Sequence, residues 1–137
     1  MKKTLMWTIT VLFLITIYSC GKEKCPTKPS SDPSLASDIQ PIFTAKCAIA
    51  SCHDTFAQAG LDLTKDKAYD NLVDVPSTND PSKIRVVRNN ANSSYLFIKI
   101  AEQPADGTAR MPIGGNPLPD NEIQLIQNWI DQGAKNN

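Results

Sequence analysis

The sequence predicts an all-α domain of roughly 100 residues, built from three to four short helices and long loops. Three segments, 37–47, 93–102 and 120–134, carry apolar residues at helical spacing. The segments between them are rich in proline, glycine, asparagine and aspartate, which favour turns. So much loop leaves few side chains for a core, because a domain of this size buries only about 60–70% of its unfolded surface.

The first predicted helix, 37–47, begins at a cap formed by Ser37 or Asp38 and holds Pro41 in its first turn. Its apolar residues would face a core. A second short helix is expected over 65–75. It stops before the proline that follows, because the residue preceding a proline disfavours the helical conformation.

The segment 93–102 predicts a buried helix behind a serine cap, and a strand is the less favoured alternative because tyrosine, phenylalanine and isoleucine also suit sheets. A brief extended stretch is expected at 84–87. The last helix, 120–134, is the clearest, with acidic residues in its first turn and Gly133 at its end. Its apolar face is made by Ile123, Leu125, Ile126, Trp129 and Ile130.

The N-terminus has the pattern of a bacterial export signal. Lys2 and Lys3 precede an almost uncharged apolar stretch at 5–18, shorter than the about 20 residues that span a membrane. The residues before Cys20 resemble a lipoprotein cleavage site. We therefore expect 1–19 to be a signal peptide and Cys20 to be lipidated, so that the rest of the chain is exported and held at a bacterial membrane, on the periplasmic or cell-surface side.

The segment 20–36 is rich in lysine, proline and serine and is interpreted as a flexible tether that contains Cys25. The folded domain is then expected over 37–137. The formal net charge of zero and the scattered basic residues give no sign of nucleic-acid binding. No catalytic triad, phosphate loop or carboxylate pair is recognisable.

The stretch CAIASCH at 47–53 is the main chemical signal in the sequence. Covalent attachment of haem requires two thiols and a histidine directly after the second thiol. Cys52 and His53 meet that adjacency, and Cys47 supplies the other thiol with two more residues between the cysteines than in the C-x-x-C-H pattern. The intervening side chains are small or flexible enough to bulge outward. A large apolar cofactor would also complete a sparse core.

A haem that transfers electrons commonly has methionine as its second axial ligand. Met111 is the only methionine after the predicted signal, and it lies in the proline- and glycine-rich loop ARMPIGGNP. Such a loop can hold a thioether at a fixed place. Two other interpretations of the cysteines stay open: a zinc site of the Cys3His type formed by Cys25, Cys47, Cys52 and His53, and a disulfide between Cys47 and Cys52.

The chain from about 37 to 134 resembles a small bacterial c-type cytochrome domain. The resemblance lies in IQPIFTAKCAIASCHD, in SSYLFIKI and in RMPIGGNPLPDNEIQLIQNWIDQGA. It implies a class-I-like cytochrome c fold around one covalent haem c, attached at Cys47 and Cys52, with His53 and Met111 as the axial ligands of the iron. The longer spacer between the cysteines is the departure from the family pattern.

The expected function is electron transfer between unidentified redox proteins rather than catalysis. A haem enzyme or ligand sensor with a displaceable Met111 is the alternative. His53 should donate its second ring proton to a backbone carbonyl within 56–61. Candidates for the haem surroundings and for contacts to its carboxylates are Arg85, Arg88, Arg110 and Trp129.

Overall fold

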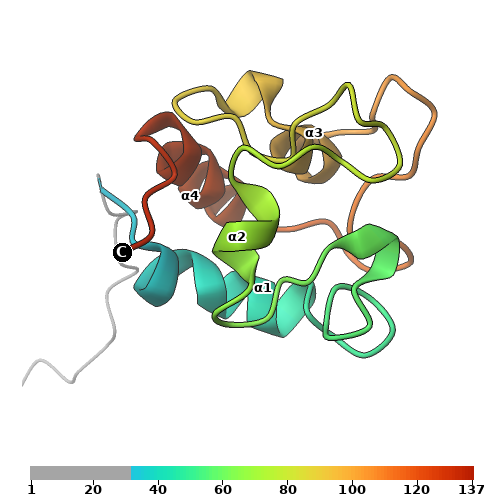
Figure 1. Ribbon diagram of the computed structural model, residues 1–137, viewed down its shortest axis with the longest axis horizontal. Coiled ribbons are helices and arrows are strands. Elements are labelled where there is room, and N and C mark those ends of the chain that lie inside the picture. The colour runs from blue at the N-terminus through green and yellow to red at the C-terminus, as the bar shows by residue number, and fades with distance from the viewer. Residues whose placement is uncertain (1–31) are drawn as a thin grey trace, which may run out of the picture.

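The computed structural model of the protein describes residues 32–137, so the predicted signal peptide and most of the predicted tether lie outside the described residues. The described chain forms helices and isolated β-bridges but no extended strand, which confirms the all-α class. Within it, no helix has the length and apolar character needed to cross a bilayer. The elements in Figure 1 are η1 (Leu35–Ile39), α1 (Gln40–Lys46), η2 (Gln58–Gly60), α2 (Ala68–Leu72), η3 (Ala91–Ser93), α3 (Tyr95–Ala101) and α4 (Asp120–Asp131).

The first helical segment begins before the predicted cap at Ser37 or Asp38. Ser34 is the N-cap, and its hydroxyl accepts a hydrogen bond from the backbone N–H of Ser37. Asp38 accepts in return from the backbone N–H of Ser34 at 2.8 Å. This is the reciprocal arrangement of a capping box, widened by one residue because η1 is a π-helical turn. Pro33 and Leu35 are buried, so packing begins within the last residues of the predicted tether.

The start of the folded region is fastened to the last described residue. Asn137 accepts three hydrogen bonds, from the hydroxyl of Ser34 and from the backbone N–H groups of Leu35 and Ala36, at 2.7–3.1 Å. The two ends therefore lie side by side, as the left of Figure 1 shows.

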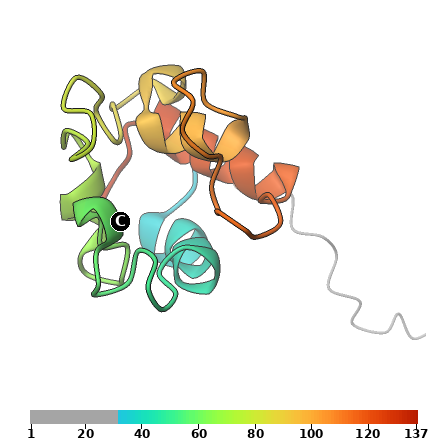
Figure 2. The same ribbon diagram turned by 90° about the vertical axis from the view of Figure 1, so that its right-hand side faces the viewer.

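The core is formed where α4 contacts both η1 and α3. Figure 2 shows α3 and α4 along one side of the domain and η1 and α1 along the other. The fully buried side chains of α4 are Ile126, Trp129 and Ile130, which are part of the predicted apolar face. As predicted, Gly133 ends the helix region: it has a φ of 98°, which residues with a side chain rarely adopt, and its N–H donates to the carbonyl of Ile130.

The predicted helix over 65–75 is shorter in the structure, because α2 ends at Leu72. Val73 forms a parallel bridge with Val86, and the N–H of Arg85 donates to the carbonyl of Val75 at 2.8 Å. These backbone partners lie ten or more positions away in the sequence and replace the next helical hydrogen bonds. The stretch predicted to be extended, 84–87, thus forms bridges to the residues after α2.

Helix α3 confirms the preference for a helix over a strand in the segment 93–102. Ser94 occupies the N-cap position, but its hydroxyl does not cap the helix. It accepts from the N–H of Val87 and donates to the carbonyl of Asn90, both at 2.8 Å. The fully buried serine therefore joins α3 to the loop before it.

The packing of α4 yields a prediction about stability. Ile130 is 0% exposed, so Ile130→Ala removes buried methyl groups and leaves a cavity. We expect the free energy of unfolding to fall by about 2–5 kcal/mol. Denaturant titration should show a lower midpoint at an unchanged slope. Ile123→Ala, on the same helix but only partly buried, is the control and should cost distinctly less; equal costs would contradict the assignment of the core.

Candidate functional site

A cavity of about 300 Å³ brings together residues from three loops and from the helices α2 and α3. Cys47 and His53 line it from the loop after α1, and Met111 lines it from the loop before α4. These two loops meet at the end of the domain seen on the right of Figure 1 and facing the viewer in Figure 2. The volume lies at the lower end of the range for ligand and cofactor pockets.

Much of the cavity wall is apolar. It is formed by leucines from the loop after α1 and from α2, together with residues of α3: Leu61, Leu63, Leu72, Leu96 and Ile100. Ile113 of the methionine loop also lines the cavity and is 68% exposed, so it stands at the border with solvent. Such a wall suits a large, mainly apolar ligand with one edge facing water.

The loop 47–53 folds back on itself. Helix α1 stops when the N–H groups of Cys47 and Ala48 both donate to the carbonyl of Phe43, at 2.9 and 2.7 Å. Ser51 then takes a φ of 65°, and the N–H of His53 donates to the carbonyl of Cys47 at 3.1 Å. The residues between the two cysteines therefore form a closed bulge, and His53 is returned close to the end of α1.

The ring of His53 is oriented by a backbone carbonyl. Its Nδ1 lies 3.1 Å from the oxygen of Leu61. A carbonyl can only accept, so this contact requires a proton on Nδ1, and in the neutral ring Nε2 then carries the lone pair. The expectation of a carbonyl partner within 56–61 is confirmed. The backbone of His53 is also held, because its carbonyl accepts from the N–H of Leu63 at 2.8 Å.

The loop that supplies this carbonyl has an uncommon backbone. Ala57, Ala59 and Gly60 all have φ between 48° and 65°. A Cβ on Gly60 would lie 2.8 Å from the hydroxyl oxygen of Thr78, so this position requires glycine for space as well as conformation. A segment of this shape needs external support, because alanine disfavours the left-handed region.

Arg85 gives that support. Its Nη2 donates to the carbonyls of Ala59 and Gly60 and to Thr78 at 2.9–3.3 Å, and its Nη1 donates to the carbonyl of Asn71 at 2.8 Å. The residue is 7% exposed and lines the cavity. Burial lowers the pKa of the guanidinium. Among residues 32–137 no carboxylate forms an ion pair with Arg85, so a cation without a counter-ion from this part of the chain stands in the cavity wall.

Met111 is held by α3. Its N–H donates to the carbonyl of Lys99 at 2.8 Å, and the ammonium group of Lys99 donates to the carbonyl of Ala109 at 2.6 Å and to the hydroxyl of Thr108 at 2.8 Å. Asp106 in the same loop binds Lys83, and hydrogen bonds from Lys83 and Thr108 hold the pKa of its carboxyl well below the usual range. The methionine loop is thus fixed at several points.

The two cysteines of the motif have different surroundings. Both are free thiols and partly buried. Burial, and to a lesser degree the charge of Glu122, raises the pKa of the Cys47 thiol to about 11. Glu122 also pairs with Lys46 at 2.8 Å, which ties the end of α1 to the start of α4. Cys52 is next to His53 in the chain but is not among the residues that line the cavity.

Several predicted site residues lie elsewhere. Trp129 is buried in the core, where its indole N–H donates to the carbonyl of Lys135 at 2.9 Å. Arg110 donates to the carbonyl of Ile100, and Arg88 pairs with Asp74 at 2.7 Å. None of the three lines the cavity. Cys20 and Cys25 are outside the described residues.

The alternative uses of the cysteines find no support in the described part of the chain. Cys47 and Cys52 do not form a disulfide. Between residues 32 and 137 no group of three or more histidine, cysteine, aspartate or glutamate side chains is placed to hold a metal ion. A zinc site that includes Cys25 involves a residue outside this range.

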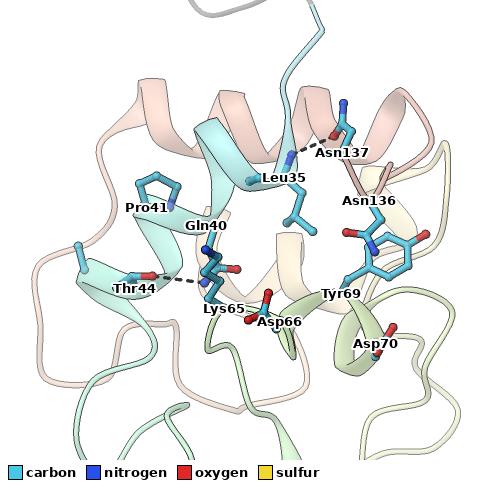
Figure 3. A pocket seen from close by; sticks show the side chains of 12 residues that line it. Leu35, Gln40, Pro41, Thr44, Lys65, Asp66, Tyr69, Asp70, Asn136 and Asn137 are labelled. Carbon is cyan, nitrogen blue, oxygen red and sulfur yellow. Dashed lines mark hydrogen bonds between the residues drawn. The ribbon is translucent and has the colours of Figure 1, made fainter.

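A second, larger cavity of about 580 Å³ shares no residue with the first. Figure 3 shows it between η1, α1, α2 and the last residues. Its wall is a mixture of small apolar, amide and charged side chains, among them Gln40, which donates to Thr44 and to the carbonyl of Leu63. It contains no cysteine, histidine or methionine, so size alone does not mark the site.

Comparison of the chain with models of protein families, with curated proteins and with solved structures gives no match.

The raised pKa of Cys47 leads to a prediction for the chain with unmodified thiols. Its alkylation should keep rising with pH up to about 11 rather than level off near 9, because only the thiolate reacts. Glu122→Gln should move this midpoint to lower pH, since it removes a negative charge and frees Lys46. Peptide mapping by mass spectrometry separates the cysteines. An unchanged profile in Glu122→Gln would contradict the prediction, and Asp120→Asn is the matched control.

Proposed function

We propose that this protein is a small c-type cytochrome that carries one covalently bound haem and transfers electrons. The observation that carries the proposal is the convergence of Cys47, His53 and Met111 on one mainly apolar cavity. The histidine and the methionine are 58 positions apart by their numbers and come from different loops. A cofactor that needs both a nitrogen and a thioether ligand gives them a common purpose.

The side chains in the cavity fit such a group. His53 presents Nε2 as a ligand because Nδ1 is engaged with Leu61. Met111 offers a thioether sulfur from the facing loop. Cys47 offers a thiol in the cavity wall, and Cys52, outside the wall but next to His53 in the chain, offers a second, so that each could add across a vinyl group. A bound haem would supply an iron that alternates between the ferrous and ferric states and so carries one electron.

Met111 distinguishes an electron carrier from a haem enzyme. An enzyme or ligand sensor needs an exchangeable position at the iron, whereas a fixed methionine occupies it. The hydrogen bonds from Met111 and Lys99 restrain the loop at both its backbone and its side chains. This favours a ligand that stays in place in both oxidation states, and hence electron transfer.

The same cavity offers partners for the carboxylates of a haem. Arg85 is a buried cation with no ion-pair partner among the described residues, and Lys99 lines the cavity with a pKa lowered by burial. Ser77, Asn79 and Thr108 add neutral donors on this side. Arg85, rather than Arg110 or Trp129, is thus the residue proposed to face the carboxylates.

The cellular setting is proposed from the sequence. The apolar segment ahead of Cys20 suits export and lipidation, which would place the domain on the outer side of a bacterial membrane. A domain with little net charge is suited to brief contacts with redox proteins that deliver and remove electrons.

The direct test is to express the chain with c-type maturation enzymes, in a host able to attach haem at long spacers. We expect a sharp reduced spectrum, and colour that stays with the polypeptide in denaturing electrophoresis. Cys52→Ser and Cys47→Ser should each leave a single thioether bond, and the double variant none. A colourless wild-type product in this host would refute the proposal, and metal analysis for zinc would follow.

Met111→Ala should keep the covalent haem but open the sixth position of the iron. Added carbon monoxide should then change the ferrous spectrum at once, and the reduction potential should fall, because a methionine ligand raises it. Asn116→Ala, a truncation in the same loop at an exposed position that does not line the cavity, is the control. If wild type binds carbon monoxide as readily as Met111→Ala, the sensor or enzyme alternative is favoured instead.

A further inference from the structure

A series of contacts connects Arg85 to the ring of His53 through one loop. The guanidinium donates to the carbonyls of Ala59 and Gly60 at 3.3 and 3.1 Å. The next residue, Leu61, provides the carbonyl that accepts from Nδ1 of His53 at 3.1 Å. Arg85 thus fixes the two peptide groups that immediately precede the histidine's partner.

The guanidinium is itself anchored on the other side. Nη1 donates to the carbonyl of Asn71 in α2, and Nη2 also donates to the hydroxyl of Thr78. The loop from Ala57 to Gly60 has little stability of its own, since all but one of its residues have positive φ. The N–H of Gln58 joins this loop to the carbonyl of Cys52 at 3.0 Å, and the planar group of Arg85 joins it to α2.

We propose that Arg85 is a positioning residue for His53. By holding Ala59 and Gly60 against the end of α2, it places the Leu61 carbonyl so that the imidazole keeps its proton on Nδ1 and its orientation in the cavity. The role of Nε2 as an iron ligand rests on the proposed function, whereas the positioning of the ring does not. Partners of this kind fix the ring of a ligating histidine and increase its basicity.

The test compares Arg85→Lys and Arg85→Gln with wild type in the haem-loaded protein. Lysine keeps the charge but lacks the fork that reaches Asn71 and the loop together. The readouts are the solvent exchange of the His53 Nδ1 proton by nitrogen-15 NMR, which is unambiguous because the chain has one histidine, and the reduction potential. Arg88→Gln is the control, because Arg88 pairs with Asp74 and does not line the cavity.

We expect exchange to be about fivefold to tenfold faster in both Arg85 variants, the scale of one hydrogen bond. The potential of Arg85→Lys should rise, because a weaker bond at Nδ1 makes the imidazole a poorer donor to ferric iron. Unchanged solvent exchange of the Nδ1 proton in both variants would overturn the proposal. A change in the reduction potential alone would not support it, because the loss of charge could cause that change. Equal acceleration in Arg88→Gln would also overturn it.

Thr78→Val covers the case in which the Arg85 variants do not fold. It removes one acceptor of Nη2 and keeps the charge of Arg85. Solvent exchange of the Nδ1 proton should therefore be faster than in wild type, by a smaller factor than in the Arg85 variants. If wild type attaches no haem, the proposed function fails, and the exchange measurement on the same chain still decides the positioning role. The amides of α4 serve there as the check that the chain is folded.

Discussion

The buried guanidinium of Arg85 is the constraint on which the site depends. Removing a cation from water is costly unless its donors find partners, and here four oxygens at 2.8–3.3 Å accept from Nη1 and Nη2. Those oxygens belong to α2, to the loop before it and to Thr78, so one side chain joins three segments that make no regular structure together. The loop in turn supplies the Leu61 carbonyl that orients His53. The charge of Arg85, which no carboxylate among the described residues pairs with, stands in the cavity wall.

The helices provide a scaffold, and the loops provide the chemistry. α4 contacts η1 and α3, and together they bury the aromatic and branched side chains of the core. Cys47, His53 and Met111 instead come from loops whose ends these helices hold, by the pair of Lys46 with Glu122 on one side and by the carbonyl of Lys99 on the other. This division is typical of proteins that place reactive groups on a rigid frame.

Local rules predicted the existence of the helices better than their limits. The cap was predicted at Ser37 or Asp38. It is Ser34 instead, because Leu35 is buried and Asn137 accepts hydrogen bonds from both Ser34 and Leu35. The helix predicted over 65–75 stops at Leu72 because Val73 bridges to Val86. In both cases the deciding partner is distant in the sequence, so no window of neighbouring residues contains it.

The sequence by itself determined the helical class, the amphipathic α4 with its end at Gly133, the adjacency of Cys52 to His53, the lone Met111 in its loop and the need for a carbonyl partner near His53. These follow from spacing and residue chemistry over short distances. Only the tertiary structure decided that Cys47, His53 and Met111 share a cavity, that Leu61 is the partner, and that Arg85 lines the site while Trp129 fills the core. The sequence does not distinguish Arg85 from Arg88. Folding does, because it buries Arg85 with no carboxylate paired to it among the described residues and pairs Arg88 with Asp74 at the surface.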